Sequence, residues 1–282
     1  MKRILYTLAI LSILLFACNI STTATPPVST IAPVASQIPT GTESPTATEP
    51  PLPTEPPAPQ PNVICNELAL FLDPILASGY NCETIPASTE GMEMYPQYTQ
   101  LSLQGYMLAD KFFTAHISIY SVQEYNNLLP DHIPAEVDNL QGLIGGGATG
   151  DSALPFLPTF PAAQVFHAQY RVLPFMSGSG IRYITLYAQY SAPINNHDLF
   201  YTYQGLTSDG KHWVSAILPV NNPILPANGD NPPGGLTWEQ FSDNYADYSV
   251  DITNTLNSQT SDSFTPTLAA LDALIASIRI QP

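Results

Sequence analysis

Basic residues are the scarcest feature of this sequence. Seven lysines and arginines stand against 23 aspartates and glutamates, and the formal net charge of the 282 residues is −16. A surface that binds phosphate groups needs clustered lysine or arginine, so the composition excludes a nucleic-acid partner. Anionic lipid head groups would repel the chain for the same reason. The partners that this charge favours are cations and basic protein surfaces.

Cysteine and long apolar runs are also scarce. The three cysteines, Cys18, Cys65 and Cys82, form no Cys-x-x-Cys pair, and the sequence predicts no zinc site. The longest apolar stretch, Ile4 to Ala17, has 14 residues, whereas a bilayer-spanning helix needs about 20. The stretch follows Lys2 and Arg3 and ends on a small residue, which is the organisation of a cleaved secretory signal over residues 1–17.

The string Leu15-Phe16-Ala17-Cys18 resembles the bacterial lipobox at every position. This resemblance implies cleavage before Cys18, a thioether-linked diacylglycerol on its sulfur, and an additional acyl chain such as palmitate, because durable anchoring needs more than one chain. We therefore expect an extracytoplasmic lipoprotein on a bacterial membrane, at the cell surface or on the periplasmic side. The Cys18 lipid would be its sole membrane contact. An uncleaved anchor and a plain secretory signal are the alternatives.

The other two cysteines are an even pair in an oxidising compartment, and the sequence predicts a Cys65–Cys82 disulfide. The segment between them, residues 66–79, is expected to form two short helical turns. Asp73 would cap the second turn, with Pro74 at its first position and Gly79 at its end. The disulfide would then hold an N-terminal helix against the rest of the protein.

Residues 18–62 comprise the lipidated cysteine and a tether rich in threonine and proline. Twelve of the 29 prolines of the chain lie in this tether, and no aromatic residue does. Such a segment cannot bury enough apolar surface to offset its ordering entropy, so a disordered, semi-rigid spacer is predicted. Residues 63–282, about 220 in number, are enough for a single globular extracytoplasmic domain.

Strand periodicity dominates residues 99–220. Apolar and polar residues alternate from Phe113 to Tyr120, and the stretches 165–175, 181–190, 199–206 and 212–220 are separated by turn signals such as Asp209-Gly210. We predict an α+β fold whose antiparallel sheet has about five to seven strands. Residues 165–220 would form a four-stranded meander in it. Met176 to Gly180 would be the first turn of this meander.

Two helices are expected to close the chain and pack on the sheet. The first would start at a capping box, Thr237 to Gln240, and continue through an apolar stripe as far as Leu256. Its other flank carries four acids, interpreted as a solvated face or, alternatively, a surface for cations: Glu239, Asp243, Asp247 and Asp251. The last helix, residues 265–280, would have Thr265 as its cap and Pro266 at its first position.

The strand order and the apolar pattern of residues 263–278 resemble PsbP-like and DcrB-like domains. Those domains are α/β/α sandwiches often found on extracytoplasmic lipoproteins. The resemblance implies a binding or accessory role more often than catalysis, and it carries no catalytic residue to this chain.

The sequence contains no motif that predicts a catalytic, cofactor or metal site. Gly145 to Gly150 matches Gly-x-Gly-x-x-Gly, but a helical segment precedes it and prolines follow, so a loop is predicted. His197-Asp198 is the one loop pairing of histidine and acid, and neighbouring strand residues would point to opposite faces. Asp230 offers one carboxylate, which is too few for a calcium cage.

Tyrosines are abundant instead, with 15 in the chain. Tyr183, Tyr187, Tyr201 and Tyr203 share one parity along neighbouring strands. An open face there would be a candidate platform for stacking on sugars or flat ligands, and a covered face would be core. We expect a non-catalytic binding or accessory role, with a glycan, a cation or a basic protein as the candidate partner. The alternative is an acidic extracytoplasmic hydrolase whose carboxylates meet only in the fold.

Overall fold

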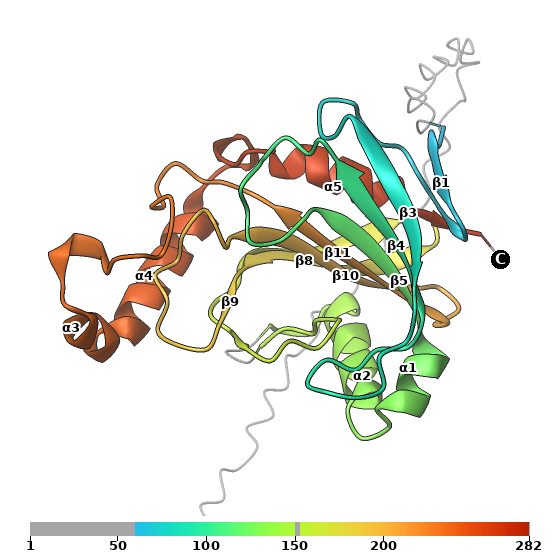
Figure 1. The fold of residues 1–282 in the computed structure, drawn as a ribbon, viewed down its shortest axis with the longest axis horizontal. Helices are drawn as coiled ribbons and strands as arrows, with labels where there is room; N and C mark the ends of the chain where they lie inside the picture. Colours follow the sequence, from blue (N-terminus) through green and yellow to red (C-terminus); the bar gives the residue numbers. More distant parts are fainter. Residues whose placement is uncertain (1–59, 150–152, 282) are drawn as a thin grey trace, which may run out of the picture. The chain divides into compact units, whose positions relative to one another are not determined.

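A seven-stranded antiparallel sheet, in the order β3-β4-β5-β11-β10-β8-β7, forms the centre of the computed structural model (Figure 1). The structure describes residues 60–149 and 153–281, so Cys18 and nearly all of the tether lie outside the described residues. The predicted α+β class is confirmed. The strands are β3 (Gly79–Ile85), β4 (Tyr98–Gln104), β5 (His116–Ser121), β7 (Ala168–Phe175), β8 (Gly178–Thr185), β10 (Phe200–Thr207) and β11 (His212–Pro219).

The predicted meander is confirmed, because β7, β8, β10 and β11 are neighbours in this order. Its first turn is shorter than predicted. Gly178 and Gly180 belong to β8 and pair with β7 and β10, which leaves Met176 and Ser177 as the turn. A Cβ atom at Gly180 would collide with the Gln204 carbonyl oxygen and the Tyr203 ring. These glycines therefore allow the backbones of β8 and β10 to approach closely, and they are not part of the turn.

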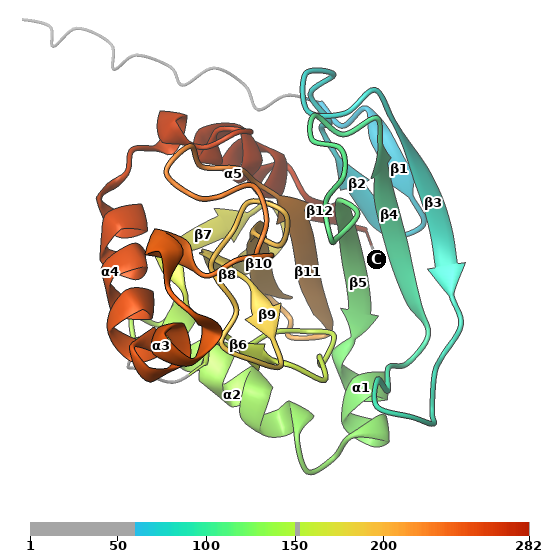
Figure 2. The same cartoon turned by 60° about the vertical axis from the view of Figure 1, so that its left-hand side comes forward.

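Helices cover both faces of the sheet (Figures 1 and 2). On one face, α1 (Val122–Leu128) and α2 (Ile133–Ile144) bury a cluster around Tyr125 and Trp213. On the other face, α5 (Leu268–Ala276) and a small sheet of β1 (Val63–Cys65), β2 (Leu68–Leu70) and β12 (Arg279–Ile280) bury a larger cluster around Tyr201 and Leu271. Among the described residues no helix combines the length and apolarity needed to cross a bilayer.

Of the two helical turns predicted for residues 66–79, the first is wrong and the second, at Asp73, is present. Leu68, Ala69 and Leu70 are all buried, and they form β2 between β1 and β12. A strand that is covered on both faces has apolar residues at successive positions rather than at alternate ones. Periodicity alone therefore does not distinguish such a strand from a buried helix. Asp73 holds only a single turn, in which its Oδ1 accepts a hydrogen bond from the Ile75 N–H at 2.8 Å.

The predicted Cys65–Cys82 disulfide is confirmed. It joins β1 to β3, the edge strand of the large sheet, and therefore links two sheets rather than a helix and a sheet. The two cysteines are 17 residues apart in the sequence.

We expect the double variant Cys65→Ala/Cys82→Ala to lose about 3 kcal/mol of unfolding free energy, because the open chain regains loop entropy in the unfolded state. Urea unfolding of oxidised wild type and of the variant measures this difference. Dithiothreitol should destabilise the wild type and leave the variant unchanged. Equal stability of the two oxidised proteins would contradict the prediction.

The predicted capping box is present: Thr237 Oγ1 accepts from the Gln240 N–H and Gln240 Oε1 accepts from the Thr237 N–H. The single helix expected from it is instead two, α3 (Trp238–Asp243) and α4 (Tyr245–Ser258). Asn244 breaks the helix because its side chain donates to the Gln240 carbonyl at 2.8 Å and so competes with the backbone. The four acids along these helices are exposed.

The last helix is shorter than predicted and has another cap. Thr267 Oγ1, not Thr265, accepts from the first turn, at the Ala270 N–H. The Thr265 backbone instead exchanges two hydrogen bonds with the Asn221 backbone, which holds it extended. Arg279 lies in β12, beyond the end of α5. Two short 3-10 turns, Pro233–Gly235 and Ser261–Ser263, complete the elements of this region.

Candidate functional site

Three adjoining hollows meet at Tyr190, on the loop that follows β9 (Tyr187–Ala188). β9 pairs with β6 (Ala163–Gln164), and this two-stranded ribbon supports the loop. We call the three hollows together the Tyr190 groove. Two of them are lined by acidic or aromatic side chains, and these two share Tyr190 and Asp198. We call them the acidic lobe and the aromatic lobe.

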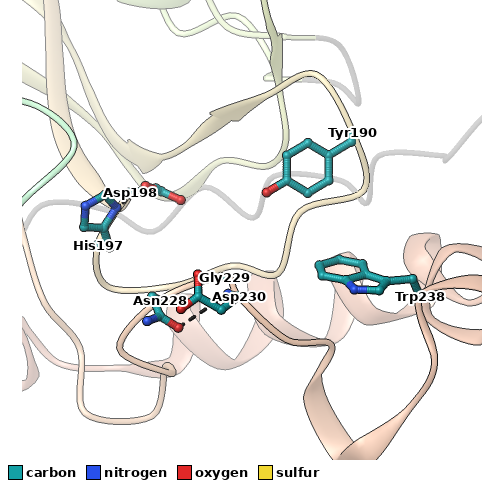
Figure 3. A pocket seen from close by; sticks show the side chains of 7 residues that line it. All are labelled: Tyr190, His197, Asp198, Asn228, Gly229, Asp230 and Trp238. Carbon is teal, nitrogen blue, oxygen red and sulfur yellow. Dashed lines mark hydrogen bonds and ion pairs between the residues drawn. The ribbon is translucent and has the colours of Figure 1, made fainter.

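The acidic lobe has a volume of about 540 Å³. Figure 3 shows Asp198 and His197 on one side of it, Tyr190 and Trp238 on the other, and Asp230 on the loop below. The Tyr190 and Trp238 rings are 6.3 Å apart at an interplanar angle of 66°. The lining residues are Tyr190, His197, Asp198, Asn228, Gly229, Asp230 and Trp238.

The aromatic lobe has a volume of about 390 Å³ and a mostly apolar wall. Phe113 contacts both Phe112 and Phe160 edge to face, with centroids 4.8 and 5.3 Å apart. Burial raises the pKa of the Tyr187 hydroxyl. Besides Tyr190 and Asp198, the lining is Glu93, Phe112, Phe113, Phe160, Pro161, Ala162, Tyr187, Ala188, Gln189 and Ala192.

Buried Asn195 holds the loop that carries Asp198. Its Oδ1 accepts from the N–H groups of His197 and Asp198, and its Nδ2 donates to Asp198 Oδ2 at 2.8 Å. The next residue, Asn196, exchanges hydrogen bonds with the Asn222 backbone. Two asparagines therefore fix the carboxylate and join this loop to the one that follows β11.

A tyrosine and a lysine fasten the same loop from outside. Tyr245 of α4 donates to the Ala192 carbonyl at 2.8 Å, and burial raises the pKa of this hydroxyl to about 12. Lys111 Nζ donates to the Asn196 carbonyl and to Asn221 Oδ1. Burial lowers the pKa of the Lys111 ammonium, and the Asp198 carboxylate acts in the opposite direction.

The prediction that the side chains of His197 and Asp198 point to opposite faces is wrong. They lie in a turn, not a strand, and His197 Nδ1 is 2.6 Å from Asp198 Oδ1. Within the described ranges no serine, threonine or cysteine side chain hydrogen-bonds the His197 ring, so a nucleophile for a triad is not in place there. Asp230 is exposed, and no cluster of three or more His, Cys, Asp or Glu in residues 60–149 and 153–281 could hold a metal ion.

The four tyrosines do not form an open platform, and the covered-face alternative is correct for three of them. Tyr183, Tyr201 and Tyr203 are completely buried. Tyr183 is the cross-strand partner of Thr202 and therefore faces away from Tyr201 and Tyr203. Tyr183 packs with α1 and α2, whereas Tyr201 and Tyr203 belong to the core on the other face. Of the four tyrosines only Tyr187 lines the groove.

Sequence reasoning missed Tyr190, Phe112 and the role of Asp198. Tyr190 stands at the end of the predicted strand 181–190, shortly before the adjacent pair Asn195-Asn196, and Phe112 directly precedes the alternation that starts at Phe113. No local pattern marked either residue as part of a site. The Gly145 to Gly150 string follows helix α2 rather than a strand, as predicted, and Gly150 lies outside the described residues. No family model, curated protein or solved structure matches the chain. The resemblance to PsbP-like and DcrB-like domains stays a prediction.

Proposed function

We propose that this protein is a lipid-anchored extracytoplasmic binding protein and that the Tyr190 groove is its ligand site. The observation that supports the proposal is the meeting of acidic and aromatic lobes at one residue, Tyr190. Both volumes, about 540 and 390 Å³, lie in the range of small-molecule sites.

Exposed aromatic rings support a binding role. Phe112, Tyr190 and Trp238 are 65%, 64% and 42% exposed, and all three border the groove. Large apolar groups gathered at one exposed place cost free energy unless a ligand covers them. The loops that carry them are fastened to a rigid sheet, which is the usual construction of a binding site.

In this proposal the Cys18 lipid anchors the protein to the membrane, and the tether sets the distance between the membrane and the groove. The proline-rich residues 19–62 would extend by about 3.1 Å each at most, so the groove would reach ligands well away from the membrane. The net negative charge of the chain would keep the domain away from anionic head groups. Capture of a soluble ligand at a distance from the membrane is the role that fits this arrangement.

A thermal-shift screen of the full chain in detergent, with glycans, organic amines and metal ions, tests the proposal. A ligand at 100 times its Kd should raise the melting temperature by about 5 °C or more. Tyr190→Ala should abolish the shift, because Tyr190 borders every lobe. Tyr80→Ala, which removes a 40% exposed tyrosine on β3, is the matched control and should keep it. A screen without any Tyr190-dependent shift would overturn the proposal.

A hydrolase is the second candidate, favoured by one observation. Asp198 and Asp230 line the same lobe as His197, and paired carboxylates are the machinery of glycoside hydrolysis. Incubation with the glycan panel and measurement of released reducing ends separates the two functions. Turnover that Asp230→Asn abolishes would identify a hydrolase, and binding without turnover would identify a receptor.

A further inference from the structure

We propose that the Tyr190 groove binds a small organic cation that carries an apolar substituent. The ammonium group would lie in the acidic lobe and the apolar group in the aromatic lobe. This inference rests on the proposed function and names the ligand class of the same site.

The negative charge of the groove lining favours a positively charged ligand. The two lobes contain three carboxylates, Glu93, Asp198 and Asp230, and no lysine or arginine lines either one. Asp230 makes no side-chain hydrogen bond or ion pair with any other described residue; only its backbone N–H is bonded, to Asn228. Lys111 is committed to Asn196 and Asn221 and does not enter the lining. Lys111 is close enough to act electrostatically on Asp198, but no ion pair with a described residue compensates Glu93 or Asp230. An anion would therefore meet net negative charge here, whereas a cation would relieve it.

The aromatic rings select an organic cation over a metal ion. Tyr190 and Trp238 line the same lobe as the two aspartates, on the side opposite Asp198 (Figure 3), and a cation attracted to a ring face binds within about 6 Å of its centroid. A hard metal ion such as Ca²⁺ takes six to eight oxygen ligands close together. The acidic lobe, at about 540 Å³, offers two carboxylates around a space far larger than an ion. An alkylated or primary ammonium fills that space better.

The aromatic lobe accounts for the apolar substituent. It shares Tyr190 and Asp198 with the acidic lobe, so a single ligand of modest length reaches both. Phe112, Phe113 and Phe160 offer ring edges and faces but no charge. A benzyl or alkyl group placed among them would be removed from water without losing a hydrogen bond.

Isothermal titration calorimetry of the full chain with choline, benzyltrimethylammonium and their neutral tert-butyl isosteres tests the inference. In each isostere a carbon atom replaces the charged nitrogen. We expect each cation to bind at least about tenfold more tightly than its isostere, a step of 1.4 kcal/mol. Benzyltrimethylammonium should bind more tightly than choline. Equal affinity of cation and isostere would overturn the inference.

Matched variants assign the two lobes. Asp230→Asn should weaken both cations about three- to tenfold and leave the isosteres unchanged. Asp251→Asn, which removes an exposed acid on α4 outside the groove, should change neither. Phe112→Ala should remove the advantage of benzyltrimethylammonium over choline. An Asp230→Asn variant that binds cations like wild type would contradict the charge argument.

The outcomes also separate this inference from the proposed function. If no cation binds but a glycan or another neutral ligand shows Tyr190-dependent binding, the cation inference fails and the binding function stands. If no ligand of any class depends on Tyr190, both fail.

Discussion

Replacing Asp272 by alanine is expected to lower the free energy of unfolding by about 3–5 kcal/mol, the usual cost of removing one partner from a buried ion pair. Asp272 lies on α5, and its side chain is 13% exposed. Its Oδ1 is 3.2 Å from Nε of Arg182 on β8, an ion pair without hydrogen-bond alignment, and accepts a hydrogen bond from the Tyr201 hydroxyl at 3.0 Å. The carboxylate thus joins the last helix to the centre of the sheet.

The cost arises from what the substitution leaves behind. The Arg182 side chain is 7% exposed, so its charge would stay buried, with the Gln169 carbonyl as its hydrogen-bond partner among the described residues. The Tyr201 hydroxyl, also buried, would lose its acceptor. Unsatisfied buried groups of both kinds are expensive because water cannot reach them.

Urea unfolding at neutral pH measures this effect, and Arg171→Ala is the matched control. Arg171 Nη1 is 3.8 Å from Asp272 Oδ2, but its side chain is 64% exposed, so its loss should cost less than about 1 kcal/mol. Asp272→Asn, which keeps the volume and an acceptor, should fall between the two. If Asp272→Ala and Arg171→Ala lose the same stability, the buried network does not hold α5 in place.

Replacing Cys18 by serine is expected to move the protein from the membrane fraction to the soluble extracytoplasmic fraction. The lipobox resemblance implies diacylglycerol on the Cys18 sulfur, and each buried CH₂ would contribute about 0.8 kcal/mol of membrane affinity. Serine has no sulfur to carry a thioether. The acidic domain then has no attraction to anionic lipids that could replace the anchor.

Fractionation, a high-salt wash and metabolic labelling with palmitate test this prediction. The double variant Cys65→Ala/Cys82→Ala is the control, because it removes two cysteines and keeps Cys18. It should stay in the membrane fraction and incorporate label. A Cys18→Ser protein that still sediments with membranes after the wash would show that another segment anchors the chain.

Local signals predicted much of the fold. The Asp209-Gly210 turn, the Thr237 capping box and the β7 to β11 meander each depend on a few adjacent residues, and all are present. The predicted secondary structure was wrong where contacts with distant parts of the chain determine it. Residues 68–70 form a strand because two other strands and a core surround them, and α5 starts late because Thr265 pairs with distant Asn221.

The candidate site was harder to predict for the same reason. Tyr183 and Tyr201 share a sequence parity, but the register of β8 against β10 places them on opposite faces. Asp198 and Trp238 are 40 residues apart, and they line one lobe because the loops after β9 and β11 meet at the same end of the sheet. The register of two strands and the proximity of two loops depend on contacts between residues far apart in the sequence. No short window of sequence contains such contacts.

Composition and local chemistry by themselves thus determined the acidic character, the disulfide pair and the strand-rich class, and they predict that nucleic acid is not a partner. Each follows from residue types and short spacings. Only the tertiary structure decided that Tyr183, Tyr201 and Tyr203 are core, that His197 contacts Asp198, and that aromatic and acidic side chains meet at Tyr190. Those outcomes depend on strand register and on hydrogen bonds between distant loops, which form only when the whole domain folds.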